Sequence, residues 1–112
     1  MAFFAVVNEQ GPAWVEGRPM REQVGWSEHA AFVNGLVRAG VILIAGPLGT
    51  GPPHVALLFV HSESEDEVRR RLLEDPWMGS GVLRIRSVES WAVLASDDRL
   101  DRVLAEIIGT AP

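Results

Sequence analysis

Two short segments of this chain, residues 2–8 and 54–61, are predicted strands that are apolar on both faces. Successive side chains of a strand point to opposite sides, and large apolar residues follow one another directly, as in Phe3 and Phe4. A sheet with one face in water alternates apolar and polar residues instead. Both faces of these two strands therefore need cover.

The remaining pattern predicts three helices and two further strands. Residues 26–39 form an amphipathic helix, with Ser27 as its N-cap and Gly40 just beyond its end. The other predicted elements are a strand over 41–45, a helix over 64–74, a strand over 82–94 that is kinked near Ser87, and a helix over 97–108 that is capped by Ser96. Residues 9–25 are predicted to be a long loop with one helical turn.

The second helix has the clearest local signals. Ser64 and Glu67 fit a capping box, and three acid-to-base pairs follow at the i,i+4 spacing: Glu65–Arg69, Asp66–Arg70 and Glu67–Arg71. Pro76 forbids further regular helix, so residues 75–77 are predicted to form a corner.

The order of these elements is β-α-β-β-α-β with an additional C-terminal helix. This is the order of the ferredoxin-like α+β fold, an antiparallel sheet with both helices on one face. A length of 112 residues suits one domain. We expect residues 1–95 to form the ferredoxin-like unit and residues 96–112 to be a helical extension of that domain.

Two core helices can cover only one face of the sheet. Either the C-terminal helix folds under the sheet, or a second copy of the chain supplies its own sheet. We favour the second arrangement, a homodimer in which two sheets pack face to face.

Composition excludes several classes of function. The formal net charge is -5, which is unfavourable for binding nucleic acid or an anionic membrane surface. The chain has no cysteine and only three histidines, so we expect no metal site and no thiolate chemistry. No signal peptide, membrane span or nucleotide-binding loop is recognisable, and we expect a cytoplasmic protein without a cofactor.

His29 and Asp75 are the candidate catalytic residues. His29 lies in the first turn of its helix, on the same stripe as Phe32 and Val33, where the helix dipole disfavours the imidazolium form. A neutral imidazole at the edge of an apolar interior can act as a general base. Asp75 follows the second helix, so the fold could bring it to His29. By periodicity alone, a structural histidine and a turn-forming aspartate are the commoner cases.

Three tryptophans and two arginines are candidate substrate-binding residues. Trp14, Trp26 and Trp77 flank the elements that carry His29 and Asp75, and large aromatic side chains commonly line small pockets. They could equally be ordinary core residues. Arg18 and Arg21 are the cations of the long loop, and either could pair with an anionic substrate group, although most loop arginines are only solvated.

The chain resembles the YCII-related (YciI-like) domain family. The resemblance rests on Glu28-His29-Ala30 leading to Gly40, on Ala45-Gly46-Pro47-Leu48, and on Asp75-Pro76-Trp77 followed by Gly81, and it runs from about residue 2 to residue 94. It implies a ferredoxin-like fold assembled as a dimeric α+β barrel, with His29 and Asp75 in the active site. One branch of the family is similar to a dehydrochlorinase. The long tryptophan-containing loop and the C-terminal helix depart from the family pattern.

Three functions follow as expectations. The first is a lyase or isomerase in which the His29–Asp75 pair moves a proton on a small cyclic or aromatic compound. The alternative is a non-catalytic dimer that binds a small molecule or serves as an accessory protein, and a purely structural oligomerisation module is a third reading.

Overall fold

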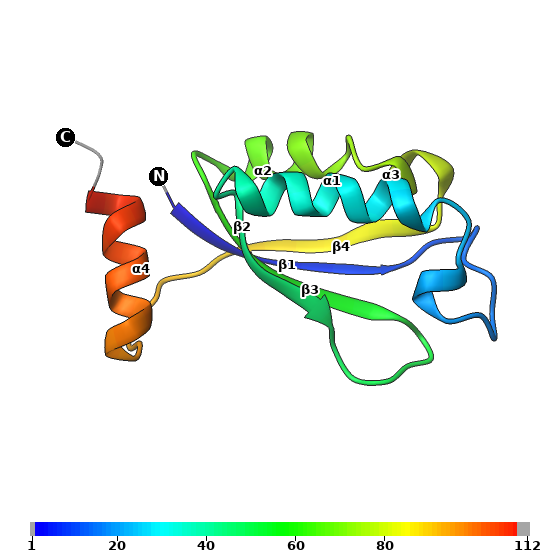
Figure 1. The fold of residues 1–112 in the computed structure, drawn as a ribbon, viewed down its shortest axis with the longest axis horizontal. Helices are drawn as coiled ribbons and strands as arrows, with labels where there is room; N and C mark the ends of the chain where they lie inside the picture. The colour runs from blue at the N-terminus through cyan, green and yellow to red at the C-terminus, as the bar shows by residue number, and fades with distance from the viewer. Residues whose placement is uncertain (1, 110–112) are drawn as a thin grey trace.

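Four strands form one antiparallel sheet in the order β2-β3-β1-β4 in the computed structural model, which describes residues 2–109. The strands are β1 (Ala2–Gln10), β2 (Ile42–Pro47), β3 (Val55–Ser62) and β4 (Leu83–Ser90). The helices are a short 3-10 turn η1 (Met20–Glu22), α1 (Trp26–Arg38), α2 (Glu65–Leu72), α3 (Pro76–Ser80) and α4 (Asp98–Gly109). Helices α1, α2 and α3 lie on one face of the sheet (Figure 1). The predicted ferredoxin-like α+β fold is confirmed.

Helix α1 begins at the predicted residue and ends as predicted, but its N-cap differs. Gly40, at a φ of 76°, donates its N–H to the carbonyl of Val37, and Val41 donates to Leu36, which is a Schellman motif. The prediction of Ser27 as N-cap is wrong. Helix α1 already begins at Trp26, so Gly25 holds the capping position, with a φ of 84° and no side-chain cap.

The predicted helix over 64–74 corresponds to α2, and a shorter helix, α3, follows it. Ser64 caps α2 as predicted, accepting a hydrogen bond from the N–H of Glu67 at 3.2 Å. Two of the three predicted i,i+4 ion pairs form, Glu65–Arg69 and Glu67–Arg71. The predicted corner at residues 75–77 is instead the start of α3, because proline is well accepted in the first turn of a helix.

Strand β4 is shorter than the predicted strand over 82–94. The partner strand β1 begins at Ala2 and runs antiparallel to β4, so its first residues pair with the end of β4. Phe4 pairs with Ser90, and the N–H of Trp91 donates to the carbonyl of Phe3. Beyond this point β1 offers no further residues to extend β4. The predicted kink is a β-bulge, since Val7 pairs with Ser87 and Asn8 with Ile85. Asp97, not Ser96, accepts the hydrogen bond from the N–H of Arg99 at the start of α4.

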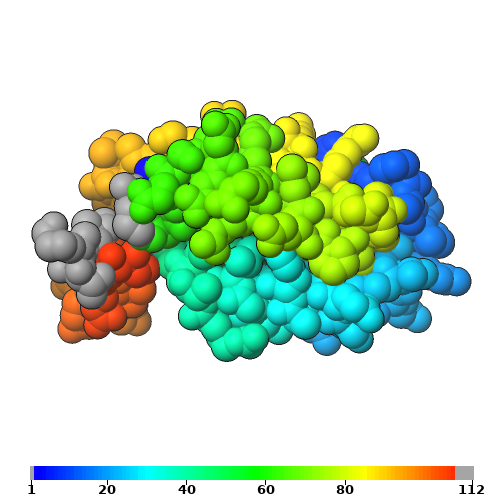
Figure 2. All heavy atoms as spheres, turned by 90° about the horizontal axis from the view of Figure 1, so that it is seen from above, coloured from blue at the N-terminus to red at the C-terminus, as the bar shows by residue number. Residues whose placement is uncertain are grey.

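Two buried clusters fill the space between the sheet and its helices. The larger one joins the inward side chains of the strands to Val68 and Leu72 of α2. The smaller one lies toward the start of α1 and contains Trp77, Val82 and Leu83, with Trp14 and Trp26 packed against it. Seen from the helical side, α1 runs alongside α2 and α3 and together they cover the sheet (Figure 2).

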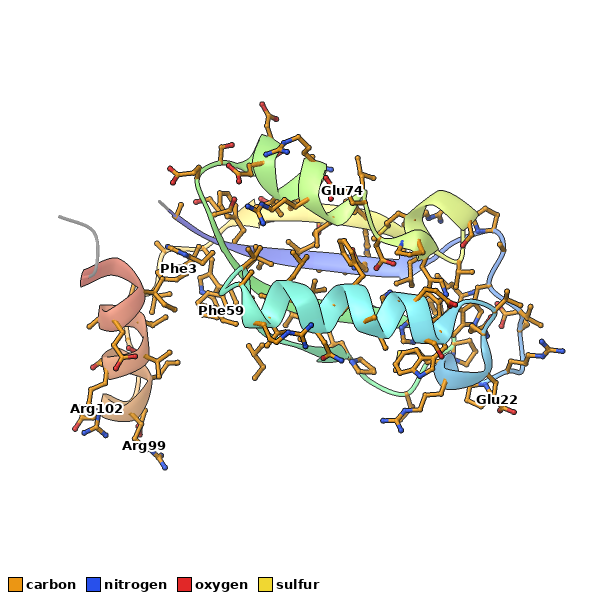
Figure 3. The ribbon with its side chains drawn as sticks, turned by 45° about the horizontal axis from the view of Figure 1, so that its top comes forward. Phe3, Glu22, Phe59, Glu74, Arg99 and Arg102 are labelled. Carbon is orange, nitrogen blue, oxygen red and sulfur yellow. The ribbon has the colours of Figure 1, made fainter. Side chains whose placement is uncertain are left out.

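The opposite face of the sheet is apolar and partly open. Helix α4 lies beyond one end of the sheet and not beneath it (Figure 1). Phe3 and Phe59 lie together near that end (Figure 3), with ring centroids 5.2 Å apart. An open groove follows this face from Leu57 to the α4 residue Leu100, and the nearby Ile44 is 70% exposed. No helix in the described part of the chain is long and apolar enough to span a membrane.

Candidate active site

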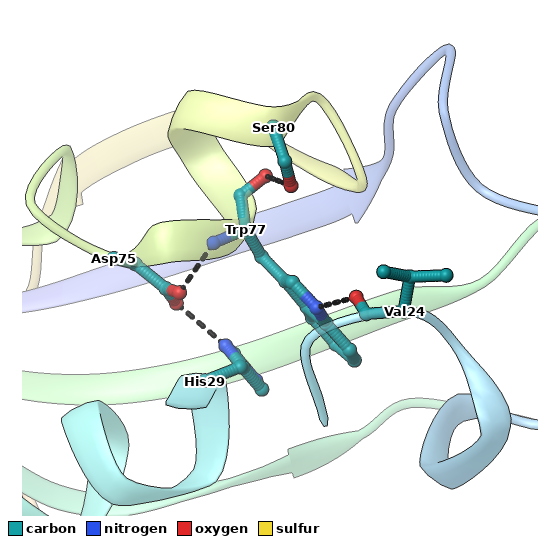
Figure 4. Close-up of polar contacts among 5 residues, drawn as sticks. All are labelled: Val24, His29, Asp75, Trp77 and Ser80. Carbon is teal, nitrogen blue, oxygen red and sulfur yellow. Dashed lines mark hydrogen bonds and ion pairs between the residues drawn. The ribbon is translucent and has the colours of Figure 1, made fainter. Parts of the chain in front are cut away.

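His29 and Asp75 form a buried hydrogen bond. The Nδ1 atom of His29 lies 2.7 Å from Oδ2 of Asp75, and the two residues are 9% and 4% exposed (Figure 4). His29 projects from the first turn of α1, and Asp75 is the N-cap of α3. The antiparallel fold places both helices on the same face of the sheet, which brings together two residues that are distant in sequence.

The orientation of the Asp75 carboxylate is determined by α3. Its Oδ1 accepts the N–H of Trp77 at 2.9 Å, in the usual manner of an aspartate N-cap. Its Oδ2 is therefore left to accept from His29. An ionised carboxylate can only accept, so Nδ1 of His29 carries the hydrogen and Nε2 of the neutral ring has a free lone pair. The pair thus presents Nε2 as a proton acceptor.

The ring of Trp77 supports His29 from one side. The two rings stack with centroids 3.9 Å apart and planes 8° from parallel. Trp77 is itself held by a hydrogen bond from its Nε1 to the carbonyl of Val24 at 2.7 Å (Figure 4). A Cβ at Gly25 would come within 3.2 Å of that Nε1 atom, in addition to the strain of a positive φ. Glycine at the start of α1 therefore lets this tryptophan pack close to the helix.

A cavity of about 280 Å³ lies between α1 and the sheet and contains the His29–Asp75 pair in its wall. This volume suits a small ligand, since the pockets that bind drug-sized molecules have volumes of about 300 Å³ or more. Most of the lining is apolar, for example Phe32, Val33 and Leu58. An imidazole with a free lone pair at the edge of such a cavity can remove a proton from a bound molecule.

The predicted aromatic residues are divided between the cavity wall and the layer behind it. Trp26 lines the cavity. Trp77 is 1% exposed and lies behind the cavity wall, where it contacts His29 and Trp26. Trp14 packs edge-on against Trp77 at 6.2 Å. Thus one of the three tryptophans faces the cavity and two support its walls.

The two predicted arginines lie outside the cavity. Arg21 places its guanidinium 5.8 Å from the ring centroid of Trp26, and both arginines have exposed side chains. Arg18 lines a separate surface hollow beside Trp14. None of the cavity-lining residues in the described part of the chain is a lysine or an arginine.

Two polar residues on the sheet side of the cavity were missed in the sequence analysis, Asn8 and His54. Asn8 is 5% exposed and its Oδ1 has no hydrogen-bond partner among residues 2–109. His54 lies just before β3 and stacks on Trp14, with ring centroids 4.4 Å apart. The alternation of side chains along a strand would have indicated both. Asn8 follows the inward residues Phe4 and Val6 at a spacing of two. His54 precedes Ala56, which faces the same side as Asn8, at the same spacing.

Burial gives His54 a pH-dependent effect on stability. Desolvation, and secondly the charge of His29, lower the pKa of His54 below its usual value. Protonation is therefore harder in the folded than in the unfolded chain. The stabilisation from neutral His54 is fully present above the unfolded pKa of about 6.5 and is lost as the pH falls through the lowered folded value.

We expect the free energy of unfolding to fall less steeply between about pH 7 and pH 5 in His54→Phe than in the wild type. Phenylalanine keeps the aromatic stack on Trp14 and cannot be protonated. Urea unfolding at a series of pH values measures this. Parallel curves for the two proteins would contradict the assignment.

No family model matches this chain, and no curated protein matches it. The resemblance to the YciI-like proteins therefore stays a prediction. Among solved structures, the chain is similar to 5-chloro-2-hydroxyhydroquinone dehydrochlorinase (TftG) from Burkholderia phenoliruptrix AC1100, determined in complex with 2,5-dihydroxybenzoquinone. The sequence identity is 22%, the TM-score is 0.48, and the alignment covers 83% of this chain and 95% of that chain.

Proposed function

We propose that this protein is a lyase or isomerase that needs no cofactor and moves a proton on a small cyclic or aromatic compound. The observation that carries the proposal is the buried hydrogen bond between His29 and Asp75 at the edge of an apolar cavity. The same pair is the active site that the resemblance to YciI-like proteins implies.

In the proposed reaction, Nε2 of His29 takes a proton from a C–H or O–H bond of the substrate. The electron pair of that bond stays on the substrate, where it moves onto a conjugated oxygen or expels a leaving group as an anion. Asp75 holds the ring in the reactive tautomer and stabilises the imidazolium that forms. Return of the proton to a different atom gives isomerisation, and loss of the leaving group gives elimination.

The tautomer of His29 tests the role of Asp75. In Asp75→Asn, the N–H of Trp77 retains the amide oxygen as its acceptor, which turns the amide NH₂ toward Nδ1 of His29. Nδ1 must then accept, so the hydrogen moves to Nε2 and the lone pair is lost from the cavity side. We expect ring ¹⁵N chemical shifts at about pH 8, where histidine is normally neutral, to show Nδ1–H in the wild type and Nε2–H in the variant.

Asp97→Asn is the matched control for this substitution. Asp97 also accepts a backbone N–H at the start of a helix, but it lies on the surface at α4. We expect this variant to leave the His29 tautomer unchanged. If wild type and Asp75→Asn show the same tautomer, Asp75 does not orient the ring and the proposed pair is wrong. A wild-type protein that exchanges or eliminates no proton from a panel of phenols, quinols and lactones in D₂O would favour the alternative of a binding protein.

The proposal includes a homodimer formed by the open face of the sheet. This face presents Ala5, Val7 and Leu57 beside the exposed Ile44, and an apolar face of this kind is normally covered in a working protein. The charged side chains of this face, Arg84 and Glu9 among them, lie on the β1–β4 side, where they pair with each other at 2.6 Å. The apolar part over β1, β3 and β2 is thus a continuous surface for a second sheet.

We expect the wild type to sediment as a dimer and Ile44→Glu to sediment as a monomer. A carboxylate at this position would be buried without a partner in a sheet-to-sheet interface, at a cost of several kcal/mol. Glu89→Gln, on the charged strand β4, is the control and should remain dimeric. A monomeric wild type at micromolar concentration would refute this assembly.

A further inference from the structure

The cavity has a second polar side that the His29–Asp75 pair does not use. His29 and Asp75 come from the helices, whereas Asn8 and His54 come from the sheet, on β1 and just before β3. A molecule in the cavity therefore lies between a helical wall that accepts protons and a sheet wall with an amide and a second imidazole.

The polar atoms of this sheet wall are not occupied by the protein. Within residues 2–109, Oδ1 of Asn8 has no hydrogen-bond partner, although the residue is more than nine-tenths buried. Only the backbone of His54 is hydrogen-bonded: its N–H donates to the side chain of Gln10 and its carbonyl accepts from the N–H of Gln10. The described residues offer no partner to its ring nitrogens. A buried polar group without a partner costs about 1–3 kcal/mol. Such groups beside a cavity are available to a ligand.

Both histidines of the cavity stack on a tryptophan ring. His29 stacks on Trp77 and His54 stacks on Trp14, with centroid distances of 3.9 and 4.4 Å, and the two tryptophans contact each other at 6.2 Å. One aromatic layer thus supports both imidazoles. A ring supported by stacking keeps its orientation without using its nitrogen atoms.

The charge that the proposed reaction creates needs a hydrogen-bond donor. When His29 takes a proton, the electron pair that remains can reach a conjugated oxygen as an enolate or a phenolate. None of the described cavity-lining residues is a lysine or an arginine, so the donors within reach are neutral groups of the wall. A neutral imidazole N–H is an effective donor to such an oxygen. It stabilises the negative charge by a hydrogen bond, and it is too weak an acid to transfer its proton to the oxygen.

We infer that a ring N–H of His54, together with the side-chain NH₂ of Asn8, donates hydrogen bonds to the oxygen of the substrate on which negative charge develops. This deepens the proposed function and rests on it, since the charge arises from proton removal by His29. The ligand class that fits is a planar molecule of one ring, with the acidic proton on one edge and a conjugated oxygen on another. The preference of His54 for its neutral form is consistent with a donor role.

The test compares 4-nitrophenolate with nitrobenzene, which has the same ring and nitro group and lacks the anionic oxygen. We expect wild type to bind the phenolate more tightly. His54→Phe should raise the Kd of the phenolate about tenfold or more, the usual effect of losing a hydrogen bond to a charged group, with little change for nitrobenzene. Asn8→Leu, of similar volume, should weaken phenolate binding in the same selective way, and His54→Gln should restore part of the affinity because it keeps an N–H donor.

The outcomes separate this inference from the proposed function. Equal Kd values for the phenolate in wild type and His54→Phe, equal losses for both probes, or a wild type that binds neither probe would overturn the role of His54. None of these measurements depends on the tautomer of His29, which tests the proposed base through Asp75→Asn. An unchanged His29 ¹⁵N spectrum in His54→Phe verifies that this variant has kept the folded site.

Discussion

His29→Gln is expected to slow the proposed proton transfer about 10²–10⁴-fold, which is the usual contribution of a general base. Glutamine can still donate a hydrogen bond to Asp75, but its amide has no basic lone pair to replace Nε2. The measurement is kcat/KM with any compound that the wild type turns over in the D₂O exchange panel. Because His29 lies at the edge of the cavity and not in the main core cluster, we expect the variant to remain folded.

Arg102→Gln is the control for this experiment. Arg102 is an exposed residue of α4, and its side chain points away from the sheet (Figure 3). This substitution should leave kcat/KM unchanged. A His29→Gln protein with the wild-type rate would remove His29 from the mechanism, and the cavity would then have to be considered as a binding site alone.

Trp77→Ala is expected to lower the free energy of unfolding by about 3–5 kcal/mol, the range for truncating a large buried aromatic side chain. Trp77 is 1% exposed, and it contacts His29, Trp14 and Trp26. Natural domains are stable by only about 5–15 kcal/mol, so this loss is a large part of the total. Urea unfolding followed by far-ultraviolet circular dichroism measures it.

Two further tryptophan variants show which contacts of Trp77 are responsible. Trp77→Phe keeps an aromatic ring against His29 but removes the hydrogen bond from Nε1 to Val24, and we expect an intermediate loss of about 1–3 kcal/mol. Trp91→Ala, at a position 42% exposed on the other side of the sheet, should cost less than Trp77→Ala. A Trp77→Ala protein as stable as the wild type would show that this residue does not hold the site together.

Local signals predicted the elements that depend on only a few neighbouring residues. The glycine after α1 and the serine before α2 act within one turn of helix, so Gly40 and Ser64 could be assigned from sequence and are confirmed. The N-cap of α1 was predicted wrongly because Gly25 is needed for the approach of Trp77, which is distant in sequence. The end of β4 was also wrong, because it depends on where β1 begins.

The candidate site shows the same division. The pattern of the chain placed His29 in the first turn of a helix and Asp75 before a proline, and these placements are correct. Strand phase would have shown that Asn8 points inward, although it was not used for this residue, and phase does not predict a cavity beside it. Sequence alone therefore established the order of elements and the chemically suitable residues, since both follow from local periodicity and capping. The tertiary structure decided the rest. His29 and Asp75, 46 positions apart, form their hydrogen bond only because α1 and α3 pack on one face of the sheet, and the same packing creates the cavity that His29 shares with His54. Contacts between distant segments depend on how helices and strands pack, and no local pattern encodes them.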